Sequence, residues 1–599
     1  MTSPASTQRV LILNDSTDTA SSGVAENTAR ALAEARVEAD IVDLSDDLSA
    51  WHPAGHSAIL TATANLDRLT PAQAALIEES VAQGAGLAAL CAARPNVLDA
   101  VFGVRFGQHI PFTGASEGGG IRFPGRALPL FEGLSLTPEE MIGHAHFGQW
   151  AAPGCQLLAT SYGGKPVAWA RRHGAGRVAY WNTGLLGERH ARGLIVQTLE
   201  AVQEVSAVPC VNAGVMQIDD FPAPLHKPLP EAVRMGLPEG PPEAFYADIW
   251  YKDVSRLARR YGVALSCFCA LRYSAWEGAA EDGTHPEPEG SLRRMFEALR
   301  RNPPAELGLH GLNHVPLTAG HWPDAREMRA ALRQAAALWE ALGCGPPPSA
   351  YVPPNNQIDA VGLAALTEVF PQIEVICSSI FGATEAGAAR EAGPEPWDPS
   401  RTALPRATSG HEAANLALFD GASQLACLGL WAHFIHPDDI DDIPPPGTAA
   451  TDRRNPFTRP WRGDTTWEGL LAQLEKLFAS VARRAPWLRY RGTTEAAQAL
   501  RAHLATEWRV AHEGETCRIA GLEGGHLRLR INHGRWRGIA RLEGARCLHE
   551  ARRGDHSLYL LKLTAPEARV ILAPVRRLGA MLRRQSGRGR SALTGADIR

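Results

Sequence analysis

The chain has 599 residues, of which 45% are apolar and 21% charged, as in an ordinary globular protein. This length exceeds what one hydrophobic core supports and predicts about three domains. The formal net charge of −4 gives no reason to expect a nucleic-acid partner. No stretch reaches the ~20 consecutive apolar residues that an integral membrane segment needs.

The beginning of the chain does not have the pattern of a secretory signal peptide. Arg9 is followed by only four strongly apolar residues, Val10 to Leu13, before the polar Asn14. The ten cysteines lie in apolar surroundings without a CxxC motif, which is typical of reduced, buried thiols. These features favour a cytoplasmic location.

Residues 1–206 alternate predicted strands and helices, which indicates an α/β accessory domain with a parallel sheet. Thr70 and Pro71 combine an N-cap side chain with proline at the first helical position, so a helix is expected from there to about Gln83. The expected strands are 10–13, 39–44, 57–60 and 87–91, with a hairpin at 167–171 and 177–181 and helices at 24–35 and 190–205. This layout resembles flavodoxin-like or class I amidotransferase-like domains.

The next region, 207–503, again alternates predicted strands and helices, in a manner compatible with a barrel of parallel strands and outer helices. Its expected strands include 263–269, 375–378 and 427–434, and its expected helices include 291–301 and 325–342.

Residues 504–574 are predicted to form short strands separated by turns, which indicates a small β-sandwich. The expected strands are 517–520, 526–531, 535–542, 557–563 and 568–572. The tail, 575–599, is basic and is expected to be disordered.

Two short motifs in the central region suggest chemistry. Asp219 and Asp220 follow the apolar run 215–218, so two carboxylates end a predicted strand, where α/β barrels place reactive groups. His310 and His314 have the i, i+4 spacing that brings two imidazoles to one side of a helix or loop. One carboxylate and two histidines suit a divalent metal such as Zn²⁺, and the other carboxylate remains available as a base. A strand-end cap and an incidental histidine pair are the alternatives.

With these motifs the chain resembles the polysaccharide deacetylases of carbohydrate esterase family 4, the NodB-homology group, and within it the large exopolysaccharide deacetylases. Asp219-Asp220 is similar to the first motif of that family and His310-x-x-x-His314 to the second. Val352-Pro353-Pro354-Asn355 resembles the third, and His433-Phe-Ile-His436-Pro437 the fifth. The resemblance implies a distorted NodB-type β/α barrel, flanked by an accessory domain and a β-sandwich.

The resemblance also implies a role for each residue. Asp219 is the expected general base, and Asp220, His310 and His314 are the expected metal ligands. Asn355 is the first residue after Pro353-Pro354 with a backbone N–H, so we assign it the oxyanion donor. His436 or His433 would protonate the leaving amine, and His436 is preferred because a His-Pro pair ends the predicted strand.

Two positions depart from the family pattern. The third motif normally begins with an arginine that orients the base, but Val352, preceded by Tyr351, occupies this position. The fourth motif has no clear counterpart around 375–378. Either another cation is expected at Asp219, with Arg272 and Arg406 as the candidates, or the pKa of this base is set differently. Asp438-Asp439 and Asp441-Asp442 are expected to form a solvated turn, and Trp322 is the best candidate for stacking on a sugar ring.

The sequence thus predicts a metal-dependent hydrolase that removes N-acetyl groups from N-acetylhexosamine units of a polysaccharide or oligosaccharide. Two other hypotheses remain open: a degenerate carbohydrate-binding or assembly protein, and an amidohydrolase of a small cytoplasmic amide. The expected partner is the glycan substrate, with no nucleic acid and no membrane segment. The oligomeric state, the metal and the hexosamine are not determined by the sequence.

Overall fold

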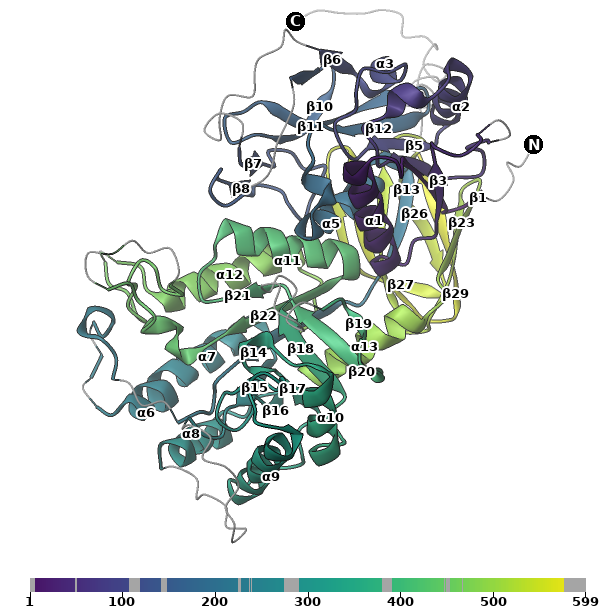
Figure 1. Cartoon of the computed structure of the whole chain (residues 1–599). Coiled ribbons are helices and arrows are strands. Elements are labelled where there is room, and N and C mark those ends of the chain that lie inside the picture. The colour runs from purple at the N-terminus through teal and green to yellow at the C-terminus, as the bar shows by residue number, and fades with distance from the viewer. Residues whose placement is uncertain are drawn as a thin grey trace, which may run out of the picture.

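The chain folds into a mixed α/β structure with several sheets (Figure 1). The computed structural model describes residues 6–48, 51–106, 119–141, 148–224, 228–235, 237, 238, 240–273, 290–379, 390–445, 448, 453–465 and 467–575. The predicted basic tail beyond Val575 lies outside these residues. Among the described helices, none combines the length and the apolar composition that crossing a bilayer requires.

The N-terminal region is built on a nine-stranded sheet of order β3-β2-β4-β5-β12-β11-β10-β7-β8, parallel from β3 to β12 and antiparallel beyond. Its strands are β2 (Val10–Asn14), β3 (Ala39–Asp43), β4 (Ala58–Thr61), β5 (Gly86–Ala89), β7 (Ile121–Arg122), β8 (Ser135–Leu136), β10 (Gln156–Thr160), β11 (Pro166–His173) and β12 (Gly176–Trp181). The predicted hairpin is β11 and β12. Between β6 (Val104–Phe106) and β9 (Gln149–Ala151) a separate antiparallel pair forms.

The helices of this region are α1 (Thr19–Glu34), α2 (Pro71–Ala82), α3 (Asp99–Phe102) and α5 (Arg192–Val202). Helix α2 begins where predicted, because Thr70 and Gln73 cap each other's backbone N–H groups. Helix α1 begins five residues earlier than the periodicity indicated. The reason is local: the Asp18 side chain accepts a hydrogen bond from the Ala20 N–H and acts as the N-cap.

The central region has a second nine-stranded sheet, of order β19-β20-β18-β17-β16-β15-β14-β22-β21. All neighbours are parallel except β19 and β20. Its strands are β14 (Ala213–Ile218), β15 (Leu265–Cys269), β16 (Glu306–Leu309), β17 (Ala350–Tyr351), β18 (Val375–Ser379), β19 (Gly393–Glu395), β20 (Asp398–Arg406), β21 (Thr408–Ser409) and β22 (Leu430–Ile435). Only Ala407 separates β20 from β21. This continuous segment pairs first with β18, near one edge of the sheet, and then with β22, near the other edge.

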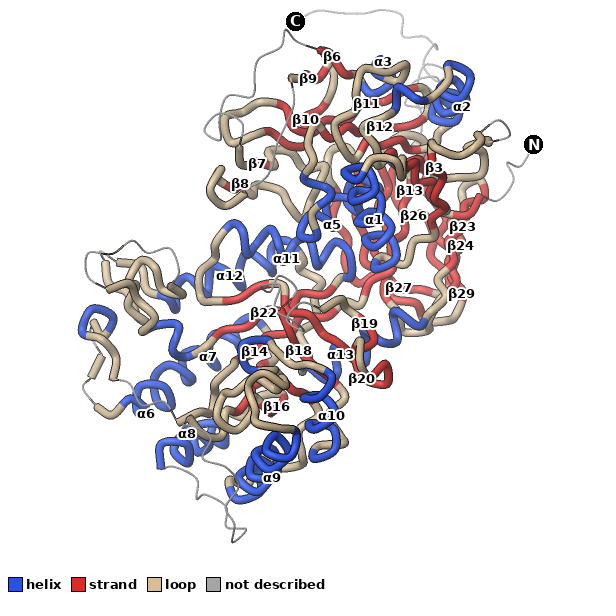
Figure 2. The backbone as a smooth tube through the Cα atoms, viewed as in Figure 1, coloured by secondary structure: helices blue, strands red, loops and turns tan. Residues whose placement is uncertain are grey.

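Helices surround this sheet (Figure 2). They are α6 (Pro242–Phe245), α7 (Tyr251–Tyr261), α8 (Gly290–Arg301), α9 (Ala325–Ala341), α10 (Ala360–Val369), α11 (Asn415–Leu428), α12 (Leu470–Arg484) and α13 (Thr493–Ala505). The strand predicted at 427–434 is too long at its start, because α11 extends to Leu428. Gly429 has the left-handed φ of 65°, which ends the helix and lets β22 begin at Leu430.

In the C-terminal region, two sheets enclose an apolar core. Their orders are β1-β23-β24-β29-β26 and β13-β25-β28-β27. The strands are β1 (Ser6–Thr7), β13 (Val205–Cys210), β23 (Arg509–Glu513), β24 (Thr516–Ala520), β25 (His526–Asn532), β26 (Trp536–Glu543), β27 (Ala545–Arg552), β28 (His556–Leu563) and β29 (Glu567–Pro574). The boundary expected between 206 and 207 falls inside β13, which pairs with β25 rather than with the central sheet.

Two helices join the N-terminal region to the central one: α5 packs against α11 (Figure 1). Gly193 permits the close approach, because a Cβ atom there would lie 2.4 Å from the Cα of Ser423. Its N–H donates to the Ser423 hydroxyl at 2.9 Å. Next to it, Arg192 forms ion pairs with Glu34 and Glu391, each at 2.8 Å. The two regions are therefore held together by packing, a hydrogen bond and the ion pair of Arg192 with Glu391.

Candidate metal centre

The predicted site residues lie at the carboxyl ends of the central parallel strands. Asp219 and Asp220 follow β14, His310 follows β16, and His436 follows β22. Because these strands are parallel and adjacent in one sheet, the residues after them meet at the same edge. This explains why motifs some ninety residues apart in the sequence come together in the structure.

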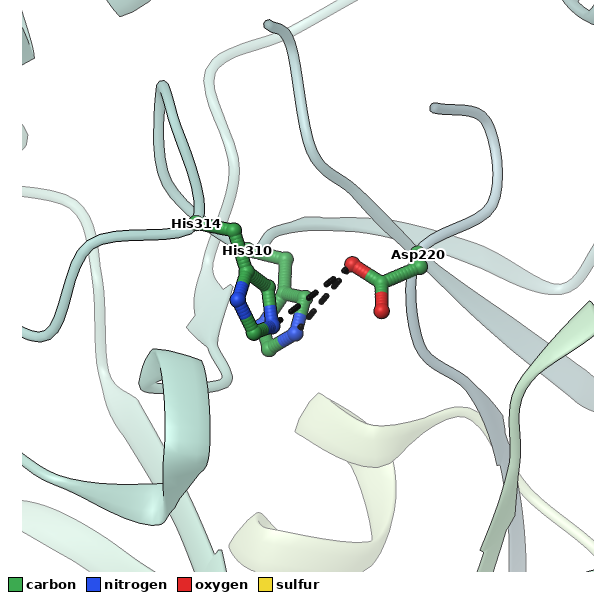
Figure 3. Close-up of side chains that lie close together, drawn as sticks. All are labelled: Asp220, His310 and His314. Atoms are coloured by element: carbon green, nitrogen blue, oxygen red, sulfur yellow. Dashed lines mark ion pairs between the residues drawn. The ribbon is translucent and has the colours of Figure 1, made fainter. Parts of the chain in front are cut away.

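Asp220, His310 and His314 form one cluster, with ligand atoms within 4.8 Å of one another (Figure 3). The Nε2 atoms of His310 and His314 lie 3.6 and 3.8 Å from Oδ1 of Asp220. Figure 3 shows both imidazoles pointing toward the same carboxylate oxygen. One oxygen and two imidazole nitrogens thus converge on one point, as in three-ligand sites of divalent metals.

Neighbouring groups fix the direction of the two histidines. Nδ1 of His310 lies 2.7 Å from the carbonyl oxygen of Val352. A carbonyl only accepts, so Nδ1 carries the proton and the lone pair of Nε2 faces the cluster. The ring of Tyr273 stacks on His314, with centroids 5.7 Å apart and planes 15° apart, and its hydroxyl donates to the Asp220 carboxylate.

Asp220 and His314 have the protonation states that a divalent metal requires. Burial alone would raise the pKa of Asp220, but the nearby imidazoles of His310, His314 and His436 outweigh it and lower the pKa. Burial and the neighbouring His310 lower the pKa of His314 to about 4, so its imidazole is neutral at pH 7. Oδ1 of Asp220 is buried and accepts no hydrogen bond from the described residues. A buried carboxylate oxygen without a donor is costly, so a cation fits this position.

Asp219 is buried beside the cluster and paired with an arginine from a distant strand. Arg406, at the end of β20, forms an ion pair and hydrogen bond with Oδ2 of Asp219 and is itself 2% exposed. Arg406 also donates to the Asn356 side chain and lies 3.7 Å above the ring of Phe434. Of the two cations named from the sequence, Arg406 therefore contacts Asp219. No ion pair joins Arg272 to Asp219 among the described residues.

His436 faces Asp219 across the site. Its Nε2 lies 3.8 Å from Oδ2 of Asp219, and its Nδ1 lies 3.1 Å from Oδ1 of Asp439. Burial disfavours the charged imidazolium, but the carboxylates of Asp439 and Asp219 outweigh it and raise the pKa of His436 to about 9. Asp439 also pairs with Arg454 at 2.8 Å and with His411 at 3.3 Å.

The expectation of a solvated acidic turn is wrong for Asp439, which is 1% exposed. Its carboxylate turns inward because it accepts from the His436 backbone N–H at 3.1 Å as well as pairing with the ring. The i, i+3 spacing of His436 and Asp439 around Pro437 is a capping pattern that indicates this contact in the sequence.

His433 and Trp322 are core residues. The ring nitrogens of His433 lie 2.7 Å from the Thr408 hydroxyl and 2.9 Å from the Gly410 carbonyl oxygen, so neither nitrogen is left for a substrate. Burial lowers the pKa of His433 to about 3. Trp322 is 8% exposed and its Nε1–H donates to the Pro316 carbonyl, so its expected role in sugar stacking is wrong.

Asn355 is exposed and lies on the turn η6 (Pro354–Asn356), in the left-handed conformation with φ 54°. The N–H groups of Asn356 and Gln357 donate within this turn, whereas no acceptor for the Asn355 N–H is found among the described residues.

Three further site residues were not foreseen: Tyr273, Asn356 and Asp439. Tyr273 and Asn356 act through contacts between separate loops, for which the sequence holds no spacing signal.

Comparisons with solved structures give only low similarity. The β-galactosidase of Bacillus circulans sp. alkalophilus matches with 16% identity and a TM-score of 0.24 over 34% of each chain. α-L-Fucosidase isoenzyme 2 of Paenibacillus thiaminolyticus matches with 13% identity and a TM-score of 0.23, over 33% of this chain and 35% of that one. A cytoplasmic protein of Salmonella typhimurium LT2 matches with 13% identity and a TM-score of 0.25, over 33% of this chain and 99% of that one.

The chain spans about a third of the length of the β-galactosidases that it matches. At these TM-scores the similarity supports no conclusion about function. Among curated proteins, no match is found. The model of one protein family matches residues 130–528, which is more than half of the chain and includes every residue of the candidate metal centre. The protein therefore belongs to the family described as "Uncharacterised protein conserved in bacteria (DUF2194)".

Proposed function

We propose that the protein is a metal-dependent hydrolase that removes N-acetyl groups from N-acetylhexosamine units of a polysaccharide or oligosaccharide. One observation carries the proposal: Asp219 and His436 face each other at 3.8 Å beside a cluster of one carboxylate and two imidazoles. A hydrolase of this kind needs a metal site, a base and an acid within reach of one bond. The glycan substrate is inferred from the resemblance of these motifs to the NodB-homology group.

Asp220, His310 and His314 would hold the metal, and Zn²⁺ is the proposed ion because the ligands are two imidazole nitrogens and one carboxylate oxygen. When bound, the metal supplies Lewis acidity, which makes water more acidic and polarises a carbonyl group. The ligand set of three leaves room for water or substrate.

The distorted β/α barrel expected for this group also remains part of the proposal. It is supported by the β20–β21 segment, which pairs with a strand near each edge of the sheet.

Asp219 is the proposed general base. Its Oδ1 is buried without a hydrogen-bond donor among the described residues, whereas Oδ2 is bound by Arg406. One oxygen is therefore fixed and the other remains free to take a proton from attacking water. Arg406 takes the orienting role that the family gives to an arginine of the third motif, from a different strand.

His436 is the proposed general acid. With a pKa of about 9 it is protonated at neutral pH and can give its proton to the leaving amine. Asp439 holds the ring through Nδ1 and leaves Nε2 to face Asp219 and the reacting group. The N–H of Asn355, for which no acceptor is found among the described residues, is the proposed donor to the oxyanion.

The proposal is tested by measuring acetate release from chitooligosaccharides and from N-acetylgalactosamine oligomers. The protein is stripped of metal, and each divalent ion is then returned alone. We expect acetate release that depends on the returned metal, with one metal bound per chain. Binding of the oligomers without acetate release under every metal would contradict the proposal and favour the glycan-binding hypothesis. Release of acetate only from small amides would favour the amidohydrolase.

A further inference from the structure

A cavity of about 380 Å³ lies where the three regions of the chain meet. Its walls come from α5 and residues 129–132 of the N-terminal region, the end of α12, and strands β25, β27 and β28. None of its lining residues belongs to the metal centre. The volume falls within the range of small-molecule sites, about 300–1,000 Å³.

The cavity and the metal centre lie toward opposite ends of the central strands. Arg528 on the cavity wall donates to the backbone carbonyls of Leu425 and Ala426, near the end of α11. This helix leads into the first residue of β22, whereas His436 follows the last residue of that strand. The six residues of β22 span about 20 Å at 3.3 Å per residue. The cavity is thus a separate site, and the argument for it does not depend on the proposed function.

Positive charge predominates on the cavity wall. Five arginines line it, against two carboxylates from Glu132 and Glu200. Both carboxylates have partners: Glu200 pairs with Arg528 at 3.2 Å, and Glu132 pairs with Arg553 at 3.3 Å. The other three arginines are Arg483, Arg484 and Arg530.

Arg530 is a buried cation without a carboxylate at ion-pair distance among the described residues. It is 2% exposed and donates to neutral acceptors, the Asn532 side chain at 2.9 Å and the Ala127 carbonyl at 2.6 Å. Burial lowers its pKa to about 10. The carboxylates of Glu200 and Asp555 favour its charge from beyond ion-pair distance. A buried charge without a direct carboxylate partner is costly, so an anion in the cavity would stabilise Arg530.

Arg484, at the end of α12, is a second arginine of the cavity wall that donates to neutral acceptors. Its Nη1 donates to the carbonyls of Leu130 and Glu132, at 3.0 and 2.8 Å. Its Nε is buried and has no hydrogen-bond partner among the described residues. Burial and the adjacent Arg483 lower the pKa of Arg484 to about 10. Two guanidinium groups without a carboxylate at ion-pair distance among the described residues therefore border one cavity. A guanidinium group binds carboxylate or phosphate through paired hydrogen bonds.

The remaining walls are apolar and aromatic. Trp487 is half-buried, and Leu130, Leu558 and Leu560 complete this surface. Such a surface accommodates a ring with an apolar face. We propose that the cavity binds a small anionic ligand with a ring-shaped body, whose phosphate or carboxylate group pairs with Arg484 and Arg530 and whose body packs against Trp487.

The experiment is calorimetric titration of the full chain with four probes: glucose 6-phosphate, glucuronate, inorganic phosphate and glucose. We expect glucose 6-phosphate or glucuronate to bind, and the tighter of the two identifies the anionic group. Glucose should not bind. Arg484→Gln should weaken binding about tenfold or more, because it removes a charged hydrogen-bond donor. Trp487→Ala should weaken binding of the sugar probe but not of inorganic phosphate.

Arg484→Gln is preferred to a change at Arg530, because the fully buried Arg530 is more important for folding. Arg489→Gln is the matched control: this arginine is exposed, close in sequence, and not on the cavity wall. Failure of both anionic sugars to bind the wild-type chain would overturn the proposal. Equal binding by wild type and Arg484→Gln would also overturn it. Inorganic phosphate binding as tightly as glucose 6-phosphate would refute the contribution of the apolar wall.

Discussion

Both α/β regions of the molecule place a buried aspartate directly after an interior parallel strand. In the N-terminal region Asp15 follows β2, and in the central region Asp219 and Asp220 follow β14. All three residues are at most 4% exposed. By location alone, at the carboxyl end of a strand, the two positions are equivalent.

They differ in how their oxygens are used. Oδ1 of Asp15 accepts from the backbone and hydroxyl of Thr17, Oδ2 accepts from Asn65, and Arg68 contacts both oxygens at 2.9 Å. Burial raises the pKa of a carboxyl, but these hydrogen bonds outweigh it and hold the pKa of Asp15 well below its usual range. In contrast, Oδ1 of Asp219 and Oδ1 of Asp220 have no donor among the described residues.

Asp15 therefore differs from Asp219 and Asp220 in whether a carboxylate oxygen remains available for chemistry. A carboxylate whose oxygens are fully bonded stabilises its loops and has nothing left for a metal or a proton. A buried carboxylate with a free oxygen carries a desolvation cost that folding alone does not explain. The free oxygens, rather than the strand-end position, therefore indicate which sheet carries the proposed reaction.

The largest effect is expected for His310→Ala, which removes a metal ligand. Metal content should fall to background, and acetate release should fall below detection, because the two remaining ligands leave the metal weakly held. The measurement is metal analysis of the purified variant together with the acetate assay. His321→Ala is the control, since His321 is exposed on the loop after His314 and contacts Thr318. A fully active, metal-loaded His310→Ala would contradict the ligand assignment.

Asp219→Asn and Asp15→Asn test the comparison directly. Asp219→Asn should keep the metal but lower kcat by about 10²–10⁴-fold, the usual contribution of a general base. Asp15→Asn should leave kcat unchanged and lower the free energy of unfolding by about 1–3 kcal/mol, because it disrupts a buried hydrogen-bond network. Acetate kinetics and denaturant unfolding of both variants give the answer. If Asp15→Asn reduces kcat as much as Asp219→Asn, the distinction between the two aspartates fails.

A smaller effect, on pH dependence, is expected for Asp439→Asn. In the wild type, kcat/KM should fall as the pH rises through about 9, where His436 loses its proton. Removing the Asp439 charge disfavours the imidazolium, so the pKa of His436 should fall and this alkaline limb should move to lower pH by about 1–3 units. Asp442→Asn is the control, because Asp442 pairs with Arg453 and Arg454 but does not contact His436. An unchanged alkaline limb would exclude His436 as the acid that Asp439 tunes.

Local sequence signals were sufficient for many elements and for the Asp-His-His cluster. The Thr70-Pro71 pair marks the start of α2, and glycines mark the β11–β12 turn, because capping and turn formation depend on neighbours in the chain. Asp220, His310 and His314 were predicted together, because apolar strands that end in polar residues meet at one edge of a parallel sheet. The spacing did not show that β13 and β1 join the C-terminal sheets, since strand pairing over hundreds of residues has no local signature.

By itself, the sequence predicted that the side chains of Asp220, His310 and His314 come together, with Asp219 beside them. Tertiary structure alone decided how the other side chains serve it. Arg406 holds Asp219 from a strand 187 residues away, Asp439 turns inward to His436, and His433 is buried against Thr408 and Gly410. The physical reason is that orientation, pKa and burial depend on charges and packing from distant segments. Only the tertiary structure shows that Asp219 and Asp220 each keep an oxygen without a donor among the described residues. The same holds for the burial of Arg530.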